Sequence, residues 1–135
     1  MADLTITAAS VTTGSRTTRI QVVESGEAVT QGQPIYLDPA TSTYLKADAN
    51  VDDKIAVEGI VITPGGIGGF PTIATSGLVN LGTTLVPGTI YVLSDTAGGI
   101  MPAADLSVGD NVVILGAATT TALLNLDIQV TGAKL

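Results

Sequence analysis

One sequence pattern occurs twice in the chain, as Gly26-Glu27-Ala28-Val29-Thr30-Gln31-Gly32 before Ile35-Tyr36-Leu37, and as Gly82-Thr83-Thr84-Leu85-Val86-Pro87-Gly88 before Ile90-Tyr91-Val92-Leu93. Both copies read glycine, two residues, an aliphatic residue, two residues, glycine, and then Ile-Tyr. Self-similarity at a fixed spacing is typical of a duplicated structural unit. A duplicated unit should repeat the same spacing further along the chain.

The match continues downstream at a nearly constant offset. Val57-Glu58-Gly59 precedes Ile114-Leu115-Gly116 by 57 residues, and Ile73-Ala74-Thr75-Ser76-Gly77 precedes Ile128-Gln129-Val130-Thr131-Gly132 by 55 residues. These landmarks predict two copies of one unit, residues 26–77 and 82–132, which together form a duplicated domain over residues 26–135.

Each unit is expected to hold four strands, because apolar runs alternate with turn-forming Gly, Pro and Asp residues. The expected strands are Pro34–Leu37, Thr43–Lys46, Lys54–Ile62 and Thr72–Thr75, then Thr89–Leu93, Ile100–Met101, Asn111–Ala117 and Leu124–Val130. The third strand of each unit is apolar on both faces, which is typical of a central strand. Gly59 and Gly116 lie inside these central strands and predict a bulge or a close backbone approach there.

Composition supports an all-β fold. The chain has 135 residues, and 14 Val, 12 Ile and 20 Thr make β-branched residues unusually frequent. Such side chains favour pleated sheets, and 16 Gly and 6 Pro supply turns. We expect a small β-barrel or β-sandwich built from the two similar units.

Charge and residue usage exclude several functions. Five Lys and Arg against 12 Asp and Glu give a net charge of −7, so phosphate backbones would repel the chain and nucleic acid is not an expected partner. Cys and His are absent, which excludes disulfides, Cys- or His-ligated metals and Ser/His triads. No run of 18 apolar residues and no basic, apolar leader occur, so we expect synthesis in a cytoplasm and no membrane span.

Residues 1–25 lie outside the duplication and are expected to form an extended N-terminal arm with the first strands. Leu4 and Ile6 alternate with threonines, as in a short strand, and residues 9–18 are rich in Ser and Thr. Both arginines, Arg16 and Arg19, lie in this segment. We expect residues 1–18 to be detachable and able to add a strand to a neighbouring sheet.

Two motifs invite a chemical interpretation. The glycine-rich stretch 64–71 lacks the Gly-Lys-Ser/Thr of a phosphate loop, so it predicts a long hairpin loop, or a partner-contact loop presenting Ile67 and Phe70. Asp48, Asp52 and Asp53 could offer oxygen ligands to Ca²⁺, but the spacing of an EF-hand is absent. A solvated loop is the interpretation we favour, with no metal and no cofactor.

No catalytic constellation is predicted, and we expect the protein not to be an enzyme. Tyr36 and Tyr91 occupy matching places in the two units and are expected to be packing residues with hydroxyls at the domain edge. Carbohydrate stacking is the alternative for this pair, although the chain has only three Tyr and one Phe.

Several stretches resemble capsid decoration (cement) proteins of tailed phages. The residues that carry the resemblance are 26–38, 44–49, 88–94, 97–100 and 102–106, and it spans most of residues 20–132. The resemblance implies a β-rich virion protein on the outer face of the phage head, which bridges major capsid proteins and reinforces their lattice. It also implies a homotrimer on the capsid.

The expected contact residues for such a partner are Leu4, Ile6, Arg16, Arg19, Ile67 and Phe70. Two other functions stay open at this point. A structural or receptor-binding module of a phage tail fibre or spike would share the glycine-framed hairpins. A bacterial surface or enzyme-like module is the third possibility.

Overall fold

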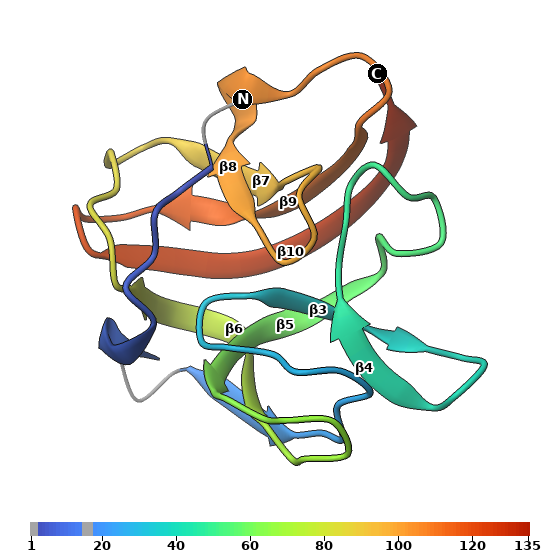
Figure 1. The fold of residues 1–135 in the computed structure, drawn as a ribbon. Coiled ribbons are helices and arrows are strands. Elements are labelled where there is room, and N and C mark those ends of the chain that lie inside the picture. Colours follow the sequence, from blue (N-terminus) through green and yellow to red (C-terminus); the bar gives the residue numbers. More distant parts are fainter. Residues whose placement is uncertain (1–2, 15–17) are drawn as a thin grey trace.

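The computed structural model describes residues 3–14 and 18–135, which form a curled antiparallel sheet (Figure 1). Eight strands follow one another in the order β4-β3-β5-β6-β10-β9-β7-β8, and β1 and β2 each pair with β6. The strands of the first part are β1 (Val11–Thr13), β2 (Arg19–Val22), β3 (Pro34–Asp38), β4 (Thr43–Lys46), β5 (Val57–Thr63) and β6 (Thr72–Leu81). Those of the second part are β7 (Ile90–Leu93), β8 (Ile100–Pro102), β9 (Asn111–Ala118) and β10 (Leu123–Lys134).

The prediction of an all-β chain is confirmed. The helical elements of the described residues are two short 3-10 helices, η1 (Ala8–Ser10) and η2 (Ala103–Asp105). Every ladder between named strands is antiparallel. The β-branched residues that dominate the composition therefore occupy the pleated positions they favour.

The duplication is visible in the strand order. The first unit has the order β4-β3-β5-β6, the second has β8-β7-β9-β10, and the pairing of β6 with β10 joins the two halves. In Figure 1 the orange and red strands of the second unit lie above the green and cyan strands of the first. Each unit thus repeats one strand order, with its third strand in a central position as expected.

Two strands are longer than the sequence pattern predicts. β6 continues from Thr72 past Gly77 to Leu81, and β10 continues to Lys134. Gly77 has a φ of +94°, so the strand can change direction there without steric cost. The first part of β6 pairs with β5 and β2, and the second part pairs with β10 and β1.

The bulges expected at the two central glycines are present. The β3–β5 register shifts between the pair Ile35–Gly59 and the pair formed by Tyr36 and Val57. The β7–β9 register shifts in the same way next to Gly116. A bulge bends its strand and increases the local twist, which helps each unit to curl around the core.

Apolar side chains bury into two clusters. The main cluster contains residues of both units, including Ile60 and Leu115, one from each central strand. A second cluster lies in the first unit and consists of Val23, Val29, Ile35, Tyr44, Val61 and Ile73. Adjacent residues of β5 therefore face different clusters, which confirms that this strand is covered on both sides.

The N-terminal segment does not stand away from the domain, so the expectation of a detachable arm is wrong for the described residues 3–14. The Leu4 N–H donates to the Ile100 carbonyl oxygen at 2.8 Å. The side chain of Val11 is only 3% exposed, and β1 pairs with the end of β6. The strand expected over Leu4 and Ile6 is absent, because these residues pack their side chains against the main core without a neighbouring ladder. Figure 1 shows this blue segment running along the side of both units.

Candidate contact surface

A glycine-rich surface loop, residues 64–71, connects β5 and β6 and is held in place by several hydrogen bonds. We call it the contact loop. Ser25 lies behind it and is fully buried. The Ser25 hydroxyl donates to the Gly66 carbonyl oxygen at 2.7 Å, and the Gly68 N–H donates to the Ser25 carbonyl oxygen at 2.8 Å. The Ser25 N–H donates to the Gly69 carbonyl oxygen at 3.0 Å. One buried serine therefore fastens the loop through its side chain and its backbone.

Further hydrogen bonds close the base and the turn of the contact loop. Val29 and Gly65 exchange two backbone hydrogen bonds, of 2.9 and 3.2 Å. Inside the loop, the Gly69 N–H donates to the Gly66 carbonyl oxygen at 2.9 Å. Gly68 has a φ of +73°, a conformation that favours glycine and allows this tight turn. The loop is thus held in one conformation although it is rich in glycine.

The contact loop presents two large apolar side chains to solvent. Ile67 is 83% exposed and Phe70 is 68% exposed. Large aromatic and apolar side chains that become covered on binding contribute strongly to the energetics of protein interfaces. These two residues were predicted as contacts, and the structure places both on the one loop that Ser25 fastens.

The other predicted contact residues are not gathered on this surface. Leu4 and Ile6 are partly buried against the main core, so they are not freely available to a partner. Arg19 is exposed on β2, opposite Ser76, at the far end of the β2–β6 ladder from Phe70. Arg16 lies outside the described residues.

Sequence reasoning missed two exposed residues beside the contact loop. Ile20 and Val22 on β2 are 60% and 64% exposed. Alternation places both on one face of the strand, opposite Ala74 and Thr72 of β6. The pattern suggested only that a strand would form here, since nothing local distinguishes an edge strand from a central one.

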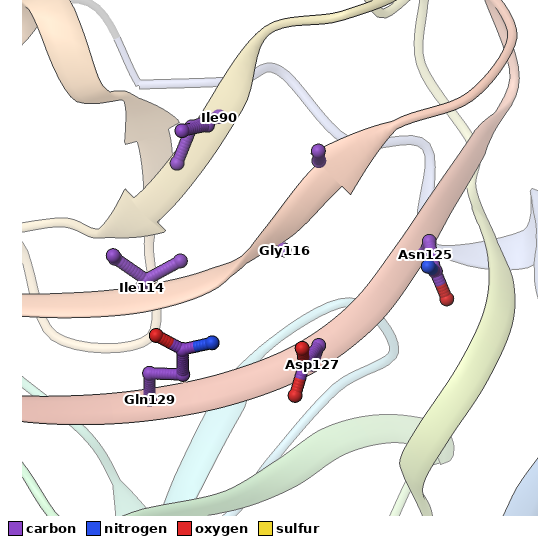
Figure 2. Close-up of a pocket in the computed structure, with 7 residues that line it drawn as sticks. Ile90, Ile114, Gly116, Asn125, Asp127 and Gln129 are labelled. Carbon is purple, nitrogen blue, oxygen red and sulfur yellow. The ribbon is translucent and has the colours of Figure 1, made fainter.

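A shallow groove of about 270 Å³ crosses the outer face of the second unit. Figure 2 shows Asn125, Asp127 and Gln129 in a row on β10, with Ile114 and Ile90 from the two neighbouring strands. Asp127 is the one ionisable group among its lining residues, so the lining offers hydrogen bonding rather than acid–base chemistry.

The acidic cluster has structural partners. Asp48 accepts the Asn50 N–H at 2.9 Å, as in a tight turn. Asp52 accepts hydrogen bonds from the Asn111 side chain and from the Lys134 ammonium, each at 3.0 Å. The pKa of Asp52 is lowered, first by the Asn111 hydrogen bond and then by Lys134. Among the residues that the structure describes, no group of three or more acidic side chains is arranged to hold a metal ion.

The two matching tyrosines are both packing residues of the main core. Tyr36 is 5% exposed and Tyr91 is 2% exposed. The Tyr91 hydroxyl accepts the Val86 N–H at 3.0 Å, so its polar end reaches the rim of the second unit as expected. Burial raises the pKa of Tyr36, with a smaller effect from Asp38. This burial leaves neither ring free as a stacking platform for a sugar.

In the described part of the chain, no helix is both long and apolar enough to cross a membrane. Comparison of the sequence with protein-family models gives no match, and comparison with curated proteins gives none either.

Proposed function

We propose that this chain is a structural protein of a phage particle, which binds the outer surface of the head and reinforces the lattice of the major capsid protein. The observation that carries the proposal is the contact loop. It presents Ile67 and Phe70 on a backbone that Ser25 already holds in place. The resemblance to decoration proteins supplies the class of partner.

A preformed apolar loop suits a binding function. Association has to offset the loss of freedom of the contacting groups, and a loop that is ordered before binding loses less. Large apolar side chains that become fully covered contribute most of the affinity of an interface. The net charge of −7 disfavours contact with packaged nucleic acid and is consistent with a place on the outer side of the shell.

Reinforcement of a shell does not need a tight single contact. A homotrimer on the capsid, as the resemblance implies, would hold several capsid subunits at once. Each further contact is then made at a high effective concentration, so weak individual contacts give strong attachment. The major capsid protein is the proposed partner, and the proposed mechanism is mechanical and without chemistry.

The copy number of the chain in purified virions tests the proposal. Quantitative mass spectrometry against the major capsid protein is expected to give a ratio near one chain per capsid subunit. A handful of copies per particle would overturn the head assignment in favour of a tail fibre or spike module. Absence from the particle would overturn every virion assignment and favour a cellular surface protein or enzyme-like module.

A further inference from the structure

β2 has an open edge. It pairs with β6 on one side, and no second strand flanks its residues Arg19–Val22 among the described residues. All four residues are exposed. The unpaired edge ends at Glu24, because the Glu24 carbonyl oxygen accepts the Tyr44 N–H of β4 at 2.8 Å. An exposed strand edge is a template for pairing with another chain, and natural proteins usually block it with charges, prolines or bulges.

The unpaired backbone groups of this edge belong to Ile20 and Val22. The Val23 N–H donates to the Pro71 carbonyl oxygen at 3.1 Å, and the Ser25 N–H donates to that of Gly69, so Val23 and Ser25 point toward the contact loop that leads into β6. Backbone groups alternate in direction along an antiparallel strand. The N–H and C=O groups of Ile20 and Val22 therefore point away from the domain.

We propose that this edge pairs with β2 of a second copy of the chain, antiparallel and centred on Gln21. In that register Ile20 of each copy lies opposite Val22 of the other, and both are hydrogen-bonded pairs because their backbone groups point outward. The four aliphatic side chains, exposed in one copy, then meet on one face of the joined strands. The contact is isologous, so it closes on itself and does not grow into a fibre.

Charge favours the antiparallel arrangement over a parallel one. Arg19 begins the open edge and Glu24 ends it, and both residues are exposed. In the antiparallel register Arg19 lies opposite Val23 of the second copy, and the two arginines lie at opposite ends of the paired stretch. A parallel arrangement would place the two arginines together, and like charges directly opposite one another destabilise a ladder.

The contact is small, so we expect a weak and concentration-dependent association. It involves the edge of β2 rather than the contact loop, and it is separate from the three-fold gathering that the resemblance implies. On a shell, it would link one decoration site to the next. If the β2 contact does not form, the proposed function is unaffected. The copy number in the particle tests attachment to the head and not pairing between copies of the chain.

Disulfide capture tests the register in the full chain, since the natural sequence has no cysteine. The central Gln21 pair is non-hydrogen-bonded, with Cα atoms expected about 4.5 Å apart, which a disulfide can span. Under mild oxidation, Gln21→Cys is expected to form a covalent dimer at least about five-fold faster than Gln129→Cys, a matched exposed glutamine on β10. Equal rates for the two variants would overturn the proposal.

A second pair of variants distinguishes pairing at β2 from cross-linking by random encounters between cysteines. In the Gln21→Cys background, Val22→Lys is expected to slow dimer formation at least about five-fold, because it places charge on the pairing face. Val86→Lys changes a valine of equal exposure (63% against 64%) elsewhere in the chain and is expected to leave the rate unchanged. A Val22→Lys variant that cross-links as fast as the Val86→Lys variant would exclude the β2 contact.

Discussion

Gly116 on β9 lies so close to β10 that any side chain at this position would collide with the carbonyl oxygen of Asn125. Gly59 on β5 has the same relationship to the carbonyl oxygen of Ala74 on β6. The two units therefore use a glycine at corresponding places, where the central strand bulges against its neighbour. This close approach explains why glycine lies inside two otherwise β-branched strands.

We expect Gly116→Val and Gly59→Val each to lower the free energy of unfolding by about 1–3 kcal/mol, because the added atoms force the two strands apart. Chemical denaturation monitored by circular dichroism measures the change. Gly66→Ala is the control, since a Cβ there meets no atom within 4 Å and the residue lies in the contact loop. Valine variants as stable as the control would show that the strands can separate at no cost.

The N-terminal segment offers a second prediction. Val11 is 3% exposed and belongs to the main core, so Val11→Ala is expected to lower stability by about 1–2.5 kcal/mol. Removing residues 2–14 should lower the melting temperature further, since β1 and the hydrogen bonds of Leu4 and Thr7 would be lost. Thr12→Ala, on the exposed side of β1, is the control. A truncated chain that melts like the full chain would mean that this segment detaches freely.

How far the sequence predicts the fold depends on whether the signal is local. The strands of both units could be placed because two copies of one pattern give two independent observations of each strand. The course of residues 3–14 could not be predicted, since Val11 is buried and Leu4 partly buried by surfaces that form only when both units are folded. The extension of β6 was missed because Gly77 suggests the end of a strand, whereas its positive φ only turns it.

For the candidate site too, the sequence predicts the local features but not the contacts between distant residues. Glycines at positions 65, 66, 68 and 69 predict a loop, and Ile67 and Phe70 were identifiable as its two large apolar residues among glycines and prolines. The fastening by Ser25 was not predictable, because this residue is 41 positions away from Gly66. Its burial and its hydrogen bonds depend on the path of the chain after β2.

The contact loop leads to a prediction on attachment. Ile67→Asp and Phe70→Asp are expected to reduce binding to purified heads that lack this protein by about ten-fold or more, because both remove apolar contact area. The fold should be unaffected, since both side chains are exposed. Val108→Asp, at a 94% exposed valine near η2, is the control. Binding is measured by co-sedimentation, and equal binding by all three variants would exclude the contact loop as the attachment surface.

Ser25 should act on attachment through the loop rather than by touching the partner. Ser25→Ala removes the hydroxyl that donates to the Gly66 carbonyl oxygen, which keeps its bond from the Gly69 N–H, so we expect a loss of about 0.5–1.5 kcal/mol. We expect more rapid amide hydrogen exchange in residues 64–70 together with weaker head binding. Unchanged exchange in this loop would show that the backbone hydrogen bonds alone hold it.

Asp95 makes the stability of the fold depend on pH. Its pKa is raised above its ordinary value of 3.8, first by burial and then by the neighbouring carboxylates of Asp110, Asp3 and Asp48. The folded state therefore binds this proton more tightly than the unfolded state, so stability falls as pH rises from 3.8 through the raised value. Above that window the ionised Asp95 destabilises the fold, and Asp95→Asn removes the charge. We expect the variant to melt at a higher temperature than the natural chain at pH 7 and at the same temperature at pH 3. A variant that melts lower at pH 7 would mean that the Asp95 carboxylate stabilises this corner of the fold.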